Sequence, residues 1–270
     1  MLRKILPSNK VFESEAFKKD RQKFYLLCQN LGRSTLELFS DEENYIFCRG
    51  AENIPTCIWS KDHINTSILK EIESGIRMFI NGTKKFDCKR ELFEMLQKDN
   101  FKPMNDDGFE IGFLLCEKTI EPLSTDGYID RPELEDEETL IEFLIDDINN
   151  MDGATPIDYV EASREIKELY SSHDFYVCGN NNGKIVCMAG VSRYDSLGKI
   201  GHVYTPPAER NNGYASNLVF EMTNKLIAQG VEPLLYTDYN YAKANRVYKK
   251  VGYEDRGTLI NFSCNKWLAA

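Results

Sequence analysis

The sequence predicts an α/β (α+β) fold, with helices flanking a mixed, twisted sheet, arranged as two tandem domains. Runs rich in β-branched and aromatic residues alternate with segments of helical period along the whole chain. The length of 270 residues suits one large domain or two ordinary ones. Residues 117–132 contain Pro122 and Gly127 but few large apolar residues, which is typical of a connection. We therefore expect domains at residues 1–121 and 122–270.

Helices and strands alternate in the first half of the chain, and no motif there carries visible chemistry. Asn65 or Thr66 caps a helix whose apolar residues recur from residue 68 to residue 79. His63, in the turn before this helix, is expected to be a surface residue rather than a catalytic one. The other expected elements are a helix from Val11 to Leu31, strands at Asn44–Cys48, Pro55–Trp59 and Lys84–Cys88, a helix at Glu91–Lys98 and a strand at Phe109–Cys116.

The second half begins with a very acidic amphipathic helix, expected over residues 133–150. One interpretation is that its carboxylates form a solvated helix face. The functional alternative is that some of them line the path by which a cationic substrate reaches the site. Thr155 and Pro156 predict a helix start, with a capping hydroxyl before proline at the first helical position. The further expected elements are a hairpin of Phe175–Cys178 and Ile185–Val191, a strand at Ile200–Thr205, a helix from Ala215 to Gly230, a strand at Leu234–Thr237, a helix at Ala242–Val251 and a strand at Leu259–Cys264.

The segment from Val203 to Ala215 joins a strand end, a rigid loop and a helix start. Pro206 and Pro207 cannot continue a hydrogen-bonded ladder, so the strand should end before them. Residues 210–215 have the pattern Arg-x-x-Gly-x-Ala, and a helical apolar period follows. A tight turn of small and polar residues that leads into a helix presents unpaired backbone N–H groups at one point. We expect this point to bind an anion, above all phosphate.

Together with a second motif, this segment resembles the GNAT superfamily of N-acetyltransferases. The Arg-x-x-Gly-x-Ala run that follows residues 203–207 is similar to the pyrophosphate loop of that family. The second motif comprises Leu235–Asn240 at a strand end, Asn245–Tyr248 on the next helix and Gly252–Tyr253 after it. The first motif alone is a weak signal, but the two motifs with strands in the expected places are specific. The resemblance covers residues 130–270.

The resemblance implies acetyl-CoA as the donor. Backbone N–H groups of the loop would cradle the pyrophosphate, where Gly213 permits close approach. The backbone of Val203 and Thr205 would pair with the pantetheine amides and stabilise the thioester oxygen as it gains negative charge. The cofactor-binding residues implied in this way are Val203, Tyr204, Thr205, Arg210, Asn211, Asn212, Gly213, Tyr214, Ala215, Asn240 and Asn245. Tyr241 follows Asn240 where the family usually has proline, which indicates a differently shaped loop on the acceptor side.

The resemblance also implies catalytic roles. Tyr248 stands where the family has its general acid, and the alternative is an aromatic residue that packs in the core or against the cofactor. The identity of the base is left open. The candidates are His202, which titrates in the useful pH range, Asp238 at the end of the neighbouring strand, and a water chain without a dedicated base.

An internal repeat is expected as well. Residues 90–96 followed by Asn100–Phe101 parallel residues 245–251 followed by Gly252–Tyr253, and a strand ending in cysteine follows each. We therefore expect the N-terminal half to be a GNAT-like accessory domain that lacks the cofactor loop. Phe93 then stands where the second half has the tyrosine of the general acid.

Composition and charge exclude several classes of partner. A formal charge of −10 disfavours general nucleic-acid binding. The eight cysteines form no Cys-x-x-Cys pair and are expected to be buried free thiols. With three scattered histidines, the sequence indicates no metal site. No apolar run is long enough to cross a bilayer and no signal peptide is recognised, so we expect a cytoplasmic protein without a membrane partner.

The leading hypothesis is an acetyl-CoA-dependent N-acetyltransferase in which a primary amine attacks the donor directly in a ternary complex. The acidic charge favours a small cationic amine, such as an amino acid or a polyamine, as the acceptor. Two alternatives use the same donor site. One is a non-catalytic acyl-CoA-binding or sensing protein, and the other is a protein-modifying acetyltransferase whose N-terminal half docks the target. The acyl chain length and the oligomeric state, a homodimer included, are left open.

Overall fold

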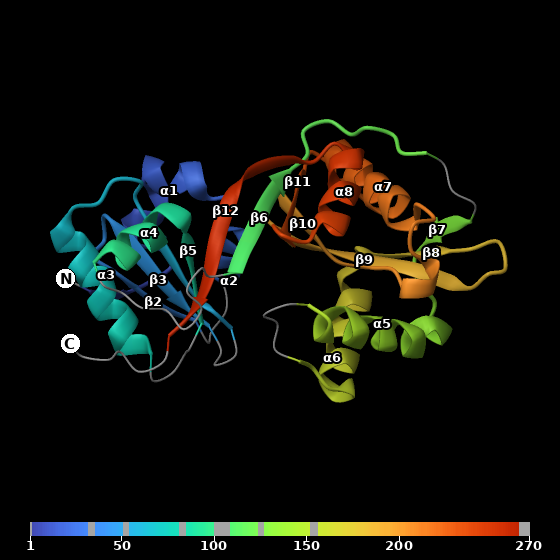
Figure 1. The fold of residues 1–270 in the computed structure, drawn as a ribbon, viewed down its shortest axis with the longest axis horizontal. Helices are drawn as coiled ribbons and strands as arrows, with labels where there is room; N and C mark the ends of the chain where they lie inside the picture. Colours follow the sequence, from blue (N-terminus) through green and yellow to red (C-terminus); the bar gives the residue numbers. More distant parts are fainter. Residues whose placement is uncertain are drawn as a thin grey trace. The chain divides into compact units, whose positions relative to one another are not determined.

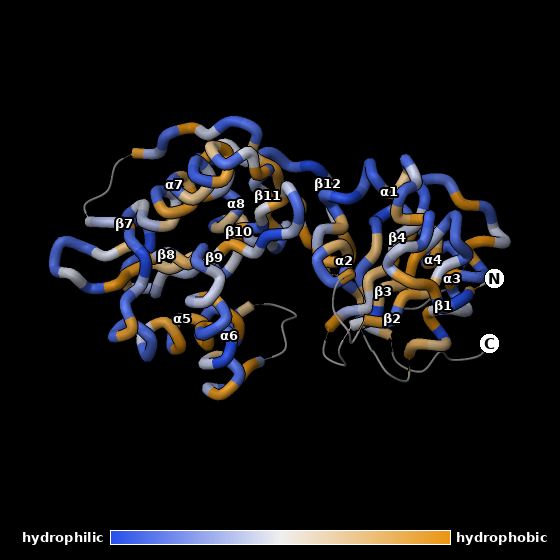
Figure 2. The backbone as a smooth tube through the Cα atoms, turned by 180° about the vertical axis from the view of Figure 1, so that it is seen from behind, coloured by the Kyte–Doolittle hydropathy of each residue, from blue (hydrophilic) through white to orange (hydrophobic). Residues whose placement is uncertain are grey.

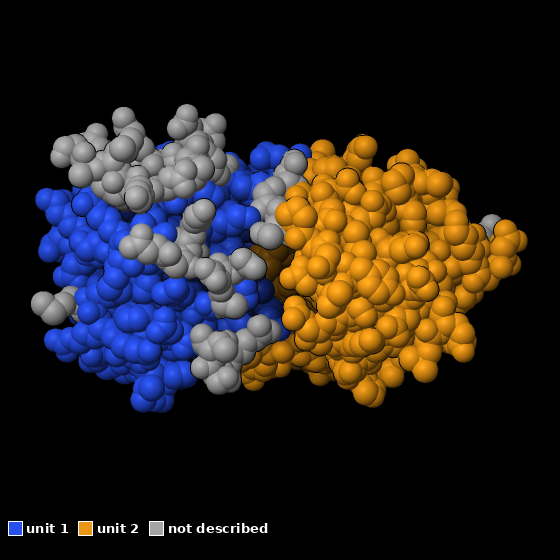
Figure 3. All heavy atoms as spheres, turned by 90° about the horizontal axis from the view of Figure 1, so that it is seen from below, with its two compact units in different colours: residues 1–113, 238–240, 257–270 blue, residues 114–237, 241–256 orange. Residues whose placement is uncertain are grey.

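The computed structural model describes residues 2–31, 36–50, 54–80, 85–99, 109–123, 127–151 and 156–264. Contacts between residues divide the chain into two compact units, which Figure 3 colours separately. Unit 1 comprises residues 1–113, 238–240 and 257–270, and unit 2 comprises residues 114–237 and 241–256. The first crossing between units lies close to the expected domain boundary after residue 121. The last segment of the chain joins unit 1, whereas the sequence analysis assigned it to the second domain.

Unit 1 is a mixed sheet flanked by helices. Its helices are η1 (Lys10–Glu13), α1 (Glu15–Asp20), α2 (Tyr25–Asn30), α3 (Thr66–Phe79) and α4 (Arg90–Lys98). Its strands are β1 (Arg3–Ile5), β2 (Glu37–Ser40), β3 (Tyr45–Arg49), β4 (Thr56–Ser60), β5 (Lys85–Lys89) and most of β12 (Glu254–Ser263). They lie in the order β1-β2-β3-β4-β5-β12, in which the β4–β5 pair is parallel and the other pairs are antiparallel.

Unit 2 is built in the same way. Its helices are η2 (Leu134–Asp136), α5 (Glu137–Asn149), α6 (Tyr159–Ser172), η3 (Pro207–Glu209), α7 (Tyr214–Ala228) and α8 (Ala242–Val251). Its strands are β7 (Tyr128–Asp130), β8 (Phe175–Gly179), β9 (Ile185–Tyr194), β10 (Leu197–Tyr204) and β11 (Glu232–Asp238). Along the sheet they follow the order of the sequence, and here the β10–β11 pair is parallel while the other pairs are antiparallel.

The two units repeat one order of α-helices and strands: a strand, two helices, three strands, a helix, a strand and a helix. The strand that follows the last helix of each unit is divided between the units. β12 pairs with β5 in unit 1, where Ile260 lies opposite Cys88. The end of β6 (Phe109–Leu115) belongs to unit 2, and just after it the N–H of Cys116 donates to the carbonyl of Pro233 on β11. This repetition agrees with the predicted internal repeat, although residues 100–101 lie outside the described part.

The sheet of unit 2 lies between two helical layers (Figure 1). α7 and α8 cover one face, with Leu218 and Val251 in the buried cluster on that side. α5 and α6 cover the other face, with Leu144 and Ile166 in a second buried cluster. Figure 2 shows apolar and polar stretches alternating along these helices, as amphipathic packing requires. The carboxyl end of β10 therefore has one helical pair on each side.

Two capping side chains begin helices at positions that differ from the prediction. Ser14 divides the helix expected over residues 11–31, because its hydroxyl accepts a backbone N–H of α1 at 3.2 Å. Asp158 begins α6 in the same way, with a carboxylate oxygen 2.9 Å from a backbone nitrogen of the first turn. This helix was expected to begin at Thr155–Pro156, and Thr155 lies outside the described residues.

Candidate functional site

Strands β10 and β11 pair only at their amino ends. Residues 197–199 lie opposite residues 232–234, in parallel register. β10 then continues to Tyr204 and β11 to Asp238, and within the described ranges no further residues of the two strands are register partners. The carboxyl ends of two neighbouring parallel strands are therefore separated, which is a position where folds of this kind bind ligands.

A β-bulge on the opposite edge of β10 accompanies this separation. The register partners on β9 are Gly190 for Gly201 and Met188 for Tyr204. Two residues of β10, His202 and Val203, therefore face a single residue of β9. His202 has a left-handed φ of 52°, which is uncommon for a residue with a side chain. Because a bulge bends its strand, this one directs the end of β10 away from a regular sheet path.

The loop after β10 folds back on the strand. The Nε of Arg210 donates to the carbonyl of Thr205 at 2.9 Å, and its guanidinium lies 5.9 Å from the ring centroid of Tyr204. Asn211 and Gly213 have positive φ values of 70° and 86°, and Gly213 begins α7. Two left-handed residues so close together turn the chain sharply in front of the helix.

Backbone N–H groups gather at this turn. Those of residues 211–216 have no acceptor within the described chain, since the first backbone bond of α7 runs from Asn217 to the carbonyl of Gly213. Glycine has no side chain with which to cap them. In unit 1 the corresponding helix α3 is capped, because Oδ1 of Asn65 accepts the N–H of Ile68 at 3.0 Å. The start of α7 thus has the unpaired donors that an anion requires, and the start of α3 satisfies one of its own.

The remaining loop residues lie around these N–H groups. Val203, Tyr214 and Ala215 are half-buried and pack against the cluster beneath α7. Asn211 and Asn212 are exposed. The structure therefore brings together at one turn the residues that the sequence analysis assigned to the pyrophosphate loop, and their role in binding stays a prediction.

Tyr204 attaches α5 to the end of β10. Its hydroxyl donates to the carboxylate of Asp146, and its ring packs against Phe143 with 5.3 Å between centroids. Burial and the hydrogen bond from Tyr204 to Asp146 raise the pKa of the Tyr204 hydroxyl. The side chain of Tyr204 is therefore used to hold a helix, which leaves only its backbone for the predicted cofactor contact.

His202 is paired with Glu165 of α6. Its Nε2 lies 3.2 Å from Oε1 of Glu165, and this hydrogen bond lowers the pKa of the Glu165 carboxyl. The positive charge of Lys199 acts on Glu165 in the same direction. One ring nitrogen of the residue predicted as a base therefore already has a carboxylate partner.

Asp147, next to Asp146 on α5, is a site residue that the sequence analysis did not single out. Burial raises the pKa of its carboxyl to about 6, an effect opposed by the charges of His202 and Arg210 and reinforced by those of Asp146 and Glu165. No donor to this carboxylate is found in the part of the chain that the structure describes. Asp147 itself is half-buried.

A sequence signal for Asp147 does exist. It follows the buried residues Leu140 and Leu144 at helical spacing, so it continues the apolar stripe of α5. A carboxylate on the apolar stripe of an amphipathic helix differs from the solvated acidic residues around it. That difference was hidden by the large number of acidic residues in the same helix.

Tyr248 lies on α8 with only 8% of its surface exposed. Burial raises the pKa of its hydroxyl, with additional contributions from the charges of Asp147 and Cys187. Its ring packs against Tyr253 with 6.2 Å between centroids. Over the described residues, no hydrogen bond to the hydroxyl is found, so the predicted acid is a protonated phenol without a partner.

The other predicted site residues make local backbone contacts. Oδ1 of Asp238 accepts the N–H of Asn240 at 2.8 Å, and both residues belong to unit 1 by their contacts. Asn245 is half-buried in the first turns of α8, and its N–H donates to the carbonyl of Tyr241 at 3.2 Å. The roles of Asp238, Asn240 and Asn245 stay predictions.

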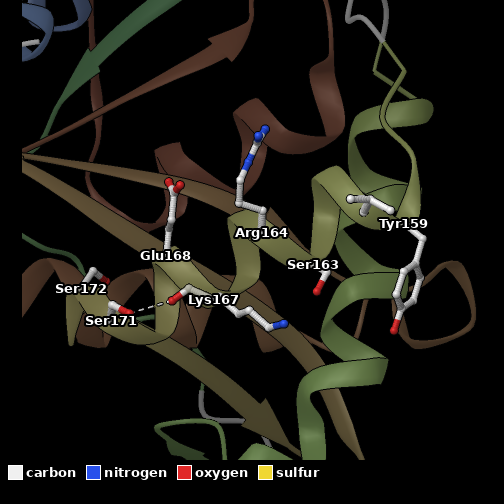
Figure 4. A pocket seen from close by; sticks show the side chains of 8 residues that line it. Tyr159, Ser163, Arg164, Lys167, Glu168, Ser171 and Ser172 are labelled. Atoms are coloured by element: carbon white, nitrogen blue, oxygen red, sulfur yellow. Dashed lines mark hydrogen bonds between the residues drawn. The ribbon is translucent and has the colours of Figure 1, made fainter. Parts of the chain in front are cut away.

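Other features of the described residues lie outside this site. A shallow hollow is lined by residues of a single helix, α6, whose side chains Figure 4 shows. Groups of three or more His, Cys, Asp or Glu side chains suited to a metal ion are absent from the described ranges. All eight cysteines are free thiols. Among the helices that the structure describes, none has the length and apolar character needed to cross a bilayer.

Comparisons with known proteins agree on one fold. Residues 179–261 match the family model described as FR47-like protein. A GCN5-related N-acetyltransferase from Sphaerobacter thermophilus is 13% identical over 97% of this chain and 94% of that chain, with a TM-score of 0.69. A GNAT-family acetyltransferase from Colwellia psychrerythraea is 11% identical over 98% and 100%, with a TM-score of 0.64. A GCN5-related N-acetyltransferase from Kribbella flavida is 11% identical over 93% and 96%, with a TM-score of 0.60.

These likenesses extend over nearly the whole chain, so they include unit 1 as well as unit 2. No curated protein sequence matches this chain significantly. At such low identity the solved structures establish the fold alone, and the family model adds a sequence match over the loop, α7, β11 and α8. The predicted fold class and the predicted resemblance to the GNAT superfamily are confirmed.

Proposed function

We propose that this chain, whose fold is that of the GNAT acetyltransferases, is an acetyl-CoA-dependent N-acetyltransferase that acts on a primary amine. The observation that carries the proposal is the row of unpaired N–H groups at residues 211–216, beside the separated ends of β10 and β11. A pyrophosphate is the ligand that such a row fits, because the positive end of a helix dipole adds to the N–H groups.

The residues present fit the rest of acetyl-CoA as well. The separated edge of β10 offers backbone groups to the amides of the pantetheine arm, in the manner of an added strand. When bound, acetyl-CoA supplies an activated acetyl group as a thioester. We expect backbone donors near Val203 and Thr205 to stabilise negative charge on the thioester oxygen, an effect typically worth about 3 kcal/mol per donor.

Tyr248 is proposed as the acid that protonates the departing sulfur. Its raised pKa keeps the phenol protonated at neutral pH, and its hydroxyl has no competing hydrogen bond in the described chain. A phenol with a raised pKa is a weak acid, so the transfer has to be concerted with departure of the thiolate. In Tyr248→Phe, turnover of a good amine should fall while acetyl-CoA binding persists. Unchanged turnover at every pH would assign Tyr248 to packing instead.

The donor site is tested by thermal unfolding with and without millimolar acetyl-CoA. A ligand at 100 times its Kd stabilises a protein by about 2.7 kcal/mol, which is readily measured as a rise in Tm. Absence of any rise would end the proposal. Release of free CoA thiol across a panel of amines then separates an enzyme from a sensor, since a sensor binds acetyl-CoA without releasing thiol. A protein-modifying enzyme would release thiol only with polypeptide acceptors.

A further inference from the structure

The side-chain amide of Asn217, near the start of α7, holds two carbonyl groups at once. Its Nδ2 donates to the carbonyl of Leu123 at 3.0 Å and to that of Gly213 at 3.2 Å. The backbone N–H of Asn217 reaches the same Gly213 carbonyl at 3.1 Å. Both donors of the amide nitrogen are therefore used. One side chain thus joins the donor loop, residues 210–215, to a residue 94 positions away in the sequence.

Leu123 lies at the end of an irregular connecting segment, residues 116–123, which crosses over α8 and α7 (Figure 1). Two earlier hydrogen bonds fasten this segment to the helices of unit 2. The N–H of Ile120 donates to a carbonyl at the end of α8 at 2.8 Å, and the hydroxyl of Thr119 donates to Oδ1 of Asn224 on α7 at 2.8 Å. The bond to the Leu123 carbonyl is a third attachment, and it is the one next to the donor loop.

Holding the Gly213 carbonyl fixes the direction of one N–H group of the predicted phosphate site. The C=O of Gly213 and the N–H of Tyr214 belong to one planar trans peptide unit, so they point in opposite directions. Because the carbonyl is bonded within α7, the N–H of Tyr214 points out of the start of the helix. Glycine is the residue with the most backbone freedom, so an anchor on its carbonyl removes motion that phosphate binding would otherwise have to remove.

The corresponding helix of unit 1 has a different arrangement. The side chain of Asn65 caps α3 by accepting the N–H of Ile68, whereas Gly213 has no side chain with which to cap α7. Four residues after these positions stand Leu69 in α3 and Asn217 in α7. The leucine side chain is buried and cannot donate a hydrogen bond. In unit 1 an amide therefore satisfies a helix N–H, and in unit 2 an amide orients the loop and leaves the N–H groups unpaired.

We propose that Asn217 is a positioning residue of the donor site, which ties the donor loop to the connecting segment and so orients the N–H of Tyr214 for the phosphates of acetyl-CoA. The inference rests on the proposed function. Both donors of the Asn217 amide are taken by carbonyl groups, so its role is to orient backbone rather than to contact the donor. Its loss should weaken binding of a donor that carries phosphates and leave the chemical step unchanged.

The kinetic test compares Asn217→Ala with the wild type for two donors. These are acetyl-CoA and S-acetylpantetheine, which has the same thioester and amides but no phosphates, with the primary amine that the wild type acetylates fastest as acceptor. We expect KM for acetyl-CoA to rise about tenfold with kcat unchanged, since two hydrogen bonds that hold the loop are lost. The value of kcat/KM for S-acetylpantetheine should stay the same. Alanine favours helices, so α7 should persist in the variant.

Asn224→Ala is the matched control. It removes a bond between the same helix and the same connecting segment, about two turns further from the donor loop, and should leave the kinetics of both donors unchanged. If Asn217→Ala lowers kcat/KM equally for the two donors, its role is merely structural and the inference is wrong. An unchanged KM for acetyl-CoA in Asn217→Ala, or an equal rise in Asn224→Ala, would overturn it as well.

A second readout does not depend on turnover. Isothermal titration with CoA should give a Kd about tenfold higher for Asn217→Ala than for the wild type, and Asn224→Ala should keep the wild-type Kd. An unchanged Kd in Asn217→Ala would contradict the inference even if no acetyl transfer is detected. A wild-type protein that binds no CoA would instead overturn the proposed function.

Discussion

The Nε2 atom of His202 lies 3.2 Å from Oε1 of Glu165 and joins the bulge of β10 to α6. The bond lowers the pKa of Glu165, so its stabilisation is present above the ordinary carboxyl pKa and is lost as pH falls through the lowered value. Glu165→Gln should reduce the free energy of unfolding at pH 7 by less than about 1 kcal/mol, since both side chains are partly exposed.

Urea unfolding at pH 7 and near pH 3 tests this expectation, because the variant and the wild type should converge at the lower pH. Glu168→Gln, an exposed carboxylate one turn later on α6, provides the control for charge alone. An equal difference at both pH values would show that the ion pair does not hold the bulge.

Gly213→Ala should weaken acetyl-CoA binding. The residue has a φ of 86° at the start of α7, which alanine adopts only with strain of about 1 kcal/mol, and its new methyl group would stand where the phosphates approach. Gly183→Ala is a matched control, because Gly183 has a φ of 78° in a hairpin turn with open space around it. Both variants should lose similar stability, and only Gly213→Ala should raise the Kd for acetyl-CoA. Equal Kd values would argue against the loop as the phosphate site.

Asp147→Asn should stabilise the protein at neutral pH. Burial raises the pKa of this carboxyl from 3.8 to about 6, so the native state holds a proton that the unfolded chain releases between these values. Wild-type stability therefore falls as pH rises from 4 to 6 and stays lower above 6, by about 2–3 kcal/mol at most. Asparagine stays neutral at every pH, so the variant does not lose this stability. Chemical unfolding should therefore show a higher free energy of unfolding for the variant at pH 7.5 and no difference from the wild type at pH 4.

Asp87→Asn tests the same stability effect in unit 1. Asp87 is half-buried, its carboxyl pKa is also raised to about 6, and it accepts a hydrogen bond of 2.6 Å from Asn261. An asparagine at residue 87 keeps an acceptor oxygen for that bond. This variant should therefore gain stability over the same pH window, measured by chemical unfolding at pH 4 and pH 7.5. A gain of equal size at both pH values would contradict the raised carboxyl pKa.

The donor side of the site could be predicted from sequence because its motif is local. The loop, the bounds of α8 at Ala242–Val251 and the left-handed Gly252 after it all follow from residues adjacent in the chain. The acceptor side could not be predicted to the same extent. The pKa of Asp147 responds to the charges of His202 and Glu165 only after α5 and α6 have packed on the sheet.

The pairing of β12 with β5 was also beyond the sequence. Phe262 of β12 stacks on Phe86 of β5 at 5.5 Å in the core of unit 1, a contact between residues far apart in the chain. Hydrophobic period predicts that a strand exists, whereas its partner depends on which sheet edge it completes.

Unit 1 has an ion-paired lysine at the carboxyl end of β5. Lys89 is 3% exposed and bridges Asp20 and Asp62, with 2.6 Å to Asp62, while Asp20 also accepts the indole N–H of Trp59 at 2.8 Å. Removing one partner of a buried pair leaves an uncompensated charge, so Lys89→Met should lower the free energy of unfolding by about 3–5 kcal/mol. Lys61→Met, which removes the exposed 3.1 Å pair with Glu43, should cost less than about 1 kcal/mol. Guanidinium unfolding of the two variants compares them directly, and equal losses would mean that the Lys89 network is as solvated as a surface pair.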